Sequence, residues 1–136
     1  MFSKDDIVFS YTTKDAVRDE VLIPIPRIVS ESLGINVPVY FNYSVWSSYV
    51  TILKEEEYTE RMSEILAEFA VRARNCNHHS LKFSVDLAMD SCWIEMRNER
   101  PAAEPGVRTV RLKAIINAHD VDDPSPAVFF MLPWED

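Results

Sequence analysis

The fold is decided by three consecutive segments, Thr109-Val-Arg-Leu-Lys-Ala-Ile-Ile116, Asn117-Ala-His-Asp-Val-Asp-Asp-Pro-Ser-Pro126 and Ala127-Val-Phe-Phe-Met-Leu132. The first places Val110, Leu112, Ala114 and Ile116 on one face and Arg111 and Lys113 on the other, which is typical of a half-buried strand. The second is rich in turn formers, so we expect a β-hairpin with a longer loop. The third is apolar on both faces and predicts an inner strand.

A long amphipathic helix is the natural cover for this hairpin. From Glu55 to Arg74, apolar residues recur at helical spacing, and acidic residues crowd the start while arginines crowd the end. The apolar positions are Tyr58, Met62, Ile65, Leu66, Phe69, Ala70 and Ala73, and Arg61 is expected on the polar side. Leu81 to Leu87 alternates strictly and predicts another strand.

Shorter elements are expected around this core. Thr12 predicts the start of a helix, a second helix should run from Arg27 to Leu33 and end at Gly34, and Ser44 should cap a third from Val45 to Val50. The segments Ile7–Tyr11 and Ile35–Tyr40 are expected as edge strands, Cys92–Met96 as a further strand, and Arg97–Gly106 as a mobile loop.

The sequence therefore predicts a single α+β domain over residues 1–136. Its antiparallel sheet should contain three to five strands, with the long helix across one face and short N-terminal helices around it. Homodimerisation through an exposed strand edge is compatible with this arrangement. The pattern alone does not decide the order of the strands.

Composition excludes several classes of protein. The formal net charge is −8, which argues against direct binding of nucleic acid because phosphates are neutralised by clustered Lys and Arg. The chain contains 2 glycines, too few for a loop that cradles nucleotide phosphates, and no cofactor is expected. No apolar run reaches the roughly 20 residues of a membrane span, and the opening Met1-Phe-Ser-Lys-Asp-Asp6 lacks signal-peptide character, so we expect a cytoplasmic protein.

Both ends and several inner segments of the chain resemble a family of small bacterial proteins of unknown function found in phages, plasmids and conjugative elements. The segment from Phe9 to Leu22, which reads Phe-Ser-Tyr-Thr-Thr-Lys-Asp-Ala-Val-Arg-Asp-Glu-Val-Leu, is similar to the family's opening, aromatic-x-Tyr-Ser/Thr-x-x-x-Ala-x-x-Asp-Gly-Val-Leu. The similarity continues at Val45-Trp46, along the long helix and at Val110-Arg-Leu-Lys-Ala114. The ending Met131-Leu-Pro-Trp-Glu-Asp136 is similar to the family's Met-Leu-Pro-x-Glu-Asp. Glu20 replaces the family's glycine, and Asn117-Ala-His-Asp120 replaces a Gly-Pro-Gly-Asp loop. The resemblance implies a mobile-element context and no particular activity.

Two groups of residues have the chemistry of metal ligands. Cys76, His78, His79 and Cys92 lack the paired spacing of a zinc site, so capping and core roles are the simpler interpretation. His119 and the acidic segment Asp120–Asp123 begin like a calcium loop, but Pro124 and Pro126 interrupt it. A solvated loop in which the aspartates cap their own turn is the alternative. A catalytic set of Cys92, His119 and Asp86 or Asp120 has no local motif to support it.

The aromatic residues are the candidates for binding a partner protein, because Trp and Tyr dominate interface hot spots. This set consists of Tyr40, Tyr43, Trp46, Tyr49 and Trp134. The first hypothesis is accordingly a non-enzymatic accessory protein that binds an unidentified protein. The second is an acidic DNA mimic, with Glu55, Glu56, Glu57, Glu60, Glu64 and Glu68 imitating phosphates. The third is a small metal-dependent enzyme that uses the cysteines and histidines.

Overall fold

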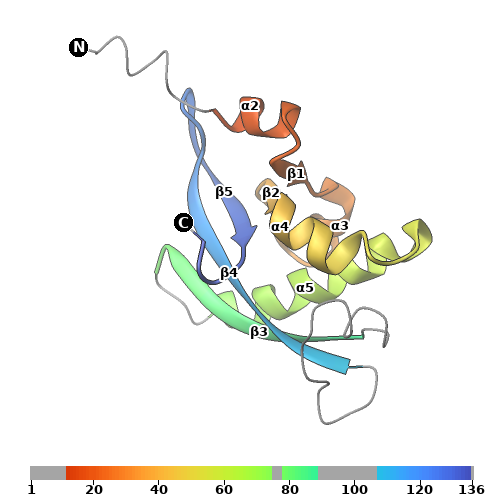
Figure 1. Ribbon diagram of the computed structural model, residues 1–136. Coiled ribbons are helices and arrows are strands. Elements are labelled where there is room, and N and C mark those ends of the chain that lie inside the picture. Colours follow the sequence, from red (N-terminus) through yellow and green to blue (C-terminus); the bar gives the residue numbers. More distant parts are fainter. Residues whose placement is uncertain (1–11, 75–77, 89–106, 136) are drawn as a thin grey trace.

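A computed structural model describes residues 12–74, 78–88 and 107–135, and it shows an α+β fold with a five-stranded sheet (Figure 1). The strands are β1 (Leu22–Pro24), β2 (Val39–Asn42), β3 (Ser80–Ala88), β4 (Val107–Asp120) and β5 (Asp123–Met131), in the spatial order β1-β2-β5-β4-β3. The expected strands at Ile7–Tyr11 and Cys92–Met96, and the loop Arg97–Gly106, lie outside the described residues.

The sheet is mixed, so the expectation of a purely antiparallel sheet is wrong. β2 runs parallel to β5, with Tyr40 opposite Phe129, whereas the other neighbouring strands pair antiparallel. β5 lies between β2 and β4, which confirms that this apolar segment is an inner strand. The parallel pairing could not be read from the sequence because the side-chain alternation of a strand is the same in either direction.

The β4–β5 hairpin is tighter than expected. Its two strands continue through the presumed loop and are joined by a turn at Val121 and Asp122. Pro124 and Pro126 are accommodated because the N–H of Val128 donates to the carbonyl of Pro38, on the side of β5 that faces away from β4. The backbone nitrogens of Pro124 and Pro126 face the same side as that of Val128, because residues at alternate positions of a strand face the same way. The pairing between β2 and β5 begins at Val128, so neither proline removes a hydrogen bond between these two strands.

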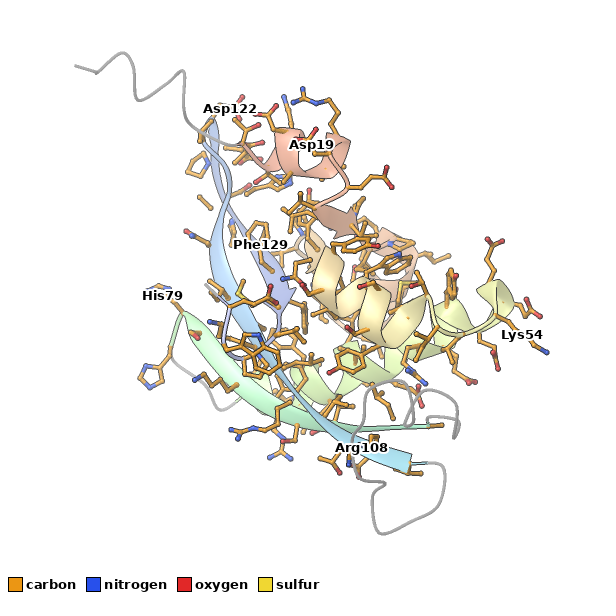
Figure 2. All side chains as sticks on the ribbon, viewed as in Figure 1. Asp19, Lys54, His79, Arg108, Asp122 and Phe129 are labelled. Atoms are coloured by element: carbon orange, nitrogen blue, oxygen red, sulfur yellow. The ribbon has the colours of Figure 1, made fainter. Side chains whose placement is uncertain are left out.

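The helices α3 (Arg27–Ser32), α4 (Tyr43–Val45) and α5 (Tyr58–Ala73) cover one face of the sheet, together with the π-helical turn η1 (Trp46–Val50) (Figures 1 and 2). A 3-10 turn, η2 (Glu55–Glu57), leads into α5. The core lies between these layers and includes Leu66, Phe69, Phe83, Leu112 and Phe130, all of which are buried. This confirms the long helix as the cover of the hairpin. No helix within the described residues is long and apolar enough to span a membrane.

Arg61 departs from the expected polar side of the long helix. Its side chain is buried, and its guanidinium donates to the carbonyl of Tyr49 at 2.6 Å and to that of Ala88, so it joins α5 to η1 and β3. Burial lowers the pKa of Arg61, and the nearby carboxylate of Glu64 opposes this effect. The apolar period of the helix predicts Arg61 on the polar side, because the convergence of two carbonyls on this position depends on the tertiary structure.

The short helices follow local capping rules with one exception. Thr12 caps α2 (Thr13–Arg18) and forms a reciprocal capping box with Asp15, and Gly34 has a positive φ of 83° after α3, both as expected. Asn42, not Ser44, caps α4 by accepting from the N–H of Val45 at 2.9 Å. Glu20, at the position where glycine was expected from the family resemblance, also has a positive φ, of 61°.

The second face of the sheet, hereafter the outer face, carries the remaining strand residues. Pairing places Lys82, Arg111, Lys113, Phe129 and Met131 on it, because each alternates with a core residue on its own strand. Near the hairpin tip, α2 lies against this region (Figure 1). Helices α3, α4 and α5 therefore cover the core side of the sheet. The outer face is not covered by these three helices, so it is the candidate location of a functional surface.

Candidate functional site

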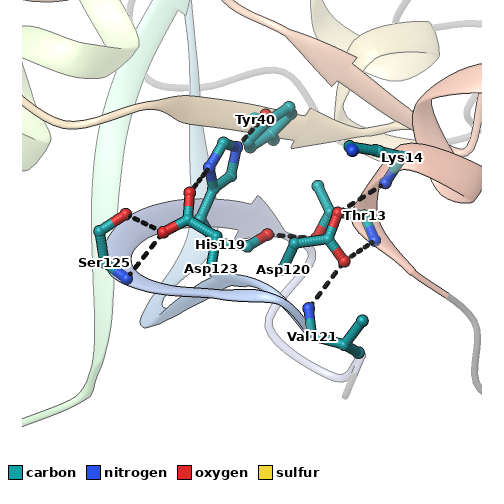
Figure 3. A network of polar contacts seen from close by, with 8 residues as sticks. All are labelled: Thr13, Lys14, Tyr40, His119, Asp120, Val121, Asp123 and Ser125. Carbon is teal, nitrogen blue, oxygen red and sulfur yellow. Dashed lines mark hydrogen bonds and ion pairs between the residues drawn. The ribbon is translucent and has the colours of Figure 1, made fainter.

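A hollow of about 700 Å³ lies between α2, the neighbouring ends of β1 and β2, and the tip of the β4–β5 hairpin. Its wall combines apolar, cationic and acidic side chains from segments far apart in the sequence. The lining residues are Thr13, Lys14, Val17, Arg18, Pro24, Tyr40, His119, Asp120, Asp122 and Asp123. Figure 3 shows the polar network along this wall.

A chain of three side chains forms the centre of the network. The hydroxyl of Tyr40 lies 2.6 Å from Nε2 of His119, and Nδ1 of His119 lies 3.0 Å from a carboxylate oxygen of Asp123. With a proton on Nδ1, His119 donates to Asp123 and accepts from Tyr40. The ring of Tyr40 also stacks on Phe129, with a centroid separation of 5.4 Å. The network therefore joins β2 to both strands of the hairpin.

Asp123 is fixed by its own turn as well as by His119. One of its oxygens accepts from the backbone N–H of Ser125 at 3.0 Å and from the Ser125 hydroxyl at 2.5 Å. The hydrogen bonds from Ser125, followed by that from His119, lower the pKa of Asp123 from 3.8 to about 2. Asp123 is consequently a carboxylate at any physiological pH.

Asp120 connects the hairpin tip to α2. Its two oxygens accept from the backbone N–H groups of Thr13 and Lys14, each at 3.1 Å, and one also accepts from Val121 at 2.7 Å. Desolvation would raise the pKa of Asp120, but the backbone hydrogen bonds from Val121, Thr13 and Lys14 and the charge of Lys14 lower it. The hydroxyl of Thr13 donates to the carbonyl of His119, which completes the attachment.

The polar side chains of this network connect α2, β2 and the β4–β5 hairpin. Burial, followed by the charges of Asp120 and Asp123, raises the pKa of Tyr40, so its hydroxyl stays protonated and is engaged by His119. Asp123 is too acidic to deliver a proton near neutral pH. Across the described ranges, every buried side-chain nitrogen and oxygen has a hydrogen-bond partner. The network thus joins β2, α2 and both strands of the hairpin through polar side chains.

The three histidines that were candidates for metal ligands do not come together in the structure. His78 and His79 lie beside the start of β3 and line a small cavity of about 30 Å³, whereas His119 lines the hollow at the hairpin tip. Figure 2 shows His79 well removed from Asp122, which marks that tip. Cys76 and Cys92 lie outside the described residues. Among the residues that are described, no group of three or more metal-ligating side chains forms a site.

The acidic segment Asp120–Asp123 makes both expected and unexpected contacts. Asp120 and Asp123 cap their own turn through Val121 and Ser125, which confirms the local interpretation. The sequence does not predict the contacts of Asp120 with Thr13 and of Asp123 with His119, because these contacts depend on the tertiary arrangement at the hairpin tip. Similarly, Glu64 and Glu68 of the proposed DNA mimic form ion pairs with Arg61 and Arg72, so these two carboxylates are partly neutralised.

The five aromatic candidates fall into buried and exposed groups. Tyr40 is buried in the network, while Trp46 and Tyr49 are half-buried against the core, with Trp46 edge-on to Tyr58. Tyr43 and Trp134 are exposed, with 57% and 77% of their surface accessible. Exposure leaves these two aromatic side chains available to a partner.

Trp134 occupies the tip of a fixed turn. Pro133 precedes it, and the N–H of Glu135 donates to the carbonyl of Leu132 at 3.0 Å, which closes the turn. The carboxylate of Glu135 accepts from the backbone N–H of Leu132 and from the side chains of Asn42 and Ser44, at 2.8, 2.9 and 3.2 Å. Desolvation opposes these bonds, but together with the charge of Lys113 they lower the pKa of Glu135.

A groove of about 360 Å³ runs beside this turn and is lined by Lys82, Arg111, Pro133 and Trp134. No sequence pattern predicts this groove, because Lys82 and Arg111 come from different strands and the turn must fold back beside them. The strict alternation around both residues predicted only that they face away from the core.

Comparison of this chain with family models, with curated proteins and with solved structures finds no match.

Proposed function

We propose that this protein acts without catalysis, by binding a partner protein through its outer face beside Trp134. The supporting observation is that 77% of the surface of Trp134 is accessible although the turn that carries it is held in place. An exposed tryptophan loses apolar hydration when a partner covers it, and tryptophan is enriched among the residues that dominate interface energetics.

The attachment of the turn favours binding further. Glu135 joins the turn to Asn42 and Ser44, on either side of the exposed Tyr43, so the two segments that carry the exposed aromatic candidates are tied together. A preformed backbone loses less conformational entropy on association than a mobile one. The setting that we propose is a mobile genetic element, because the segments from Phe9 to Leu22 and from Met131 to Asp136 resemble the family described above.

Site-specific photocrosslinking tests this function. A photoreactive phenylalanine analogue replaces Trp134, and in a matched control it replaces Ile28, which is 80% exposed on α3. We expect the probe at position 134 to capture one protein reproducibly from a bacterial lysate, and the probe at position 28 not to capture it. The captured protein is then purified and titrated calorimetrically against the unmodified chain and against Trp134→Ala.

Binding that weakens at least tenfold in Trp134→Ala would support the proposal, since an anchor tryptophan contributes about 2 kcal/mol or more. Equal capture at positions 134 and 28, or equal affinity of the two chains for the purified protein, would refute it. Capture of a second copy of the chain would show that the partner is the chain itself and that this face forms a homodimer.

A further inference from the structure

We propose that the groove beside Trp134 binds an acidic segment of the partner, with Lys82 and Arg111 pairing with its carboxylates. This inference rests on the proposed protein-binding function and adds the chemistry of the partner. A carboxylate suits the planar guanidinium of Arg111, which can donate two parallel hydrogen bonds to it, while Trp134 offers an apolar surface alongside. Both cations and Trp134 line the same groove.

The register of β3 and β4 concentrates positive charge at this groove. Lys82 is directly opposite Lys113, and Ser84 is opposite Arg111, so three cations lie on adjacent positions of the outer face. Like charges directly opposite each other across two strands destabilise the pair. An anion bound over Lys82 and Arg111 would relieve this repulsion, so the arrangement favours a negatively charged partner.

Within the described part of the chain, carboxylates leave this charge largely unpaired. Lys113 donates to the backbone carbonyl of Glu135, and Asp86, on the same face of β3, accepts from the hydroxyl of Thr109 at 2.6 Å. Neither Lys82 nor Arg111 forms an ion pair with a carboxylate of residues 12–74, 78–88 or 107–135. Both side chains are exposed and thus accessible.

An acidic protein segment fits better than nucleic acid. The formal net charge of the chain is −8, which disfavours the long phosphate backbone of a nucleic acid. A short peptide can place its carboxylates over the groove alone. Charges are screened beyond about 8 Å at physiological ionic strength, so the local cations outweigh the distant acids for such a ligand.

Nuclear magnetic resonance titration with two peptides tests the inference. The probes are Ac-Glu-Glu-Leu-Glu-Glu-amide and the same peptide with glutamine in place of every glutamate. We expect the glutamate peptide to shift the signals of Lys82, Arg111 and the Trp134 indole, and to bind at least tenfold more tightly than the glutamine peptide at low salt. Lys82→Gln and Arg111→Gln should each weaken binding about three- to fivefold. Lys54→Gln, at an exposed lysine that does not line this groove, should leave binding unchanged.

The alternative results are distinct from those for the proposed function. Equal binding of the two peptides, shifts confined to other surfaces, or tighter binding of a single-stranded oligonucleotide at this groove would overturn the acidic-segment inference. If the protein captured through position 134 also binds Lys82→Gln and Arg111→Gln with unchanged affinity, the inference fails while protein binding stands. Failure of capture at position 134 refutes the proposed function itself.

Discussion

The hydroxyl of Tyr40 lies 2.6 Å from Nε2 of His119, so a single side-chain contact joins β2 to the tip of the β4–β5 hairpin. The two residues are 79 positions apart, and neither belongs to a motif. Asp123 holds the other nitrogen of the same ring, which fixes its orientation. The position of the hairpin tip relative to α2 and the sheet therefore depends on a small number of polar contacts.

Tyr40→Phe is expected to reduce the free energy of unfolding by about 0.5–1.5 kcal/mol, because it leaves Nε2 of His119 without its partner while retaining the ring stack on Phe129. Urea denaturation followed by circular dichroism measures the change. Tyr43→Phe, at an exposed tyrosine, serves as the matched control and should have little effect. Equal stability of Tyr40→Phe and the original chain would show that this hydrogen bond contributes nothing.

Acidification should remove the contribution of Asp123 to stability. The hydrogen bonds from Ser125 and His119 lower its pKa from 3.8 to about 2 in the folded state, so the carboxylate form stabilises the folded protein. This contribution is fully present above pH 3.8 and is lost as the pH falls through about 2. Melting temperatures of the original chain and Asp123→Asn should differ above pH 5 and converge towards pH 2. A difference that grows on acidification would contradict the assignment.

Arg61→Met should destabilise the protein by about 2–4 kcal/mol, because the carbonyls of Tyr49 and Ala88 lose a buried donor that methionine cannot replace. Chemical denaturation provides the measurement. Arg72→Met on the same helix removes an exposed ion pair with Glu68 and should change stability by less than about 0.5 kcal/mol. Similar losses for the two variants would mean that burial of Arg61 has no special role.

Glu20→Gly should stabilise the protein by as much as about 1 kcal/mol. The φ of 61° at Glu20 places a non-glycine residue in the left-handed region, and relief of that strain exceeds the extra entropy that glycine gives the unfolded chain. Thermal and urea unfolding measure the effect. Glu60→Gly, at an exposed position in the first turn of α5, is the control and should destabilise by as much as about 1 kcal/mol. Destabilisation by Glu20→Gly would show that the backbone at this position is not strained.

The α+β class, the long helix and the capping of α2 could be predicted because each depends on side chains near one another in the sequence. The alternation from Val110 to Ala114 placed this part of the hairpin correctly, and Thr12 and Asp15 placed the start of a helix. Ile116 shares the core-facing side of β4 but is 38% exposed, and it lines the small cavity beside Phe69 and Ala73 of α5 instead of packing into the core.

The sequence by itself determined the long helix, the start of α2 and the apolar parts of β3, β4 and β5, since the period of apolar residues and the preferences of capping residues are local. Only the tertiary structure decided that β2 runs parallel to β5, that the hairpin continues past Pro124 and Pro126, and that Arg61 is buried. It also decided which charged residues meet, such as Lys82 opposite Lys113 beside the Trp134 groove. Those features depend on contacts between distant segments, and the free energy of such contacts is fixed by geometry that no local pattern encodes.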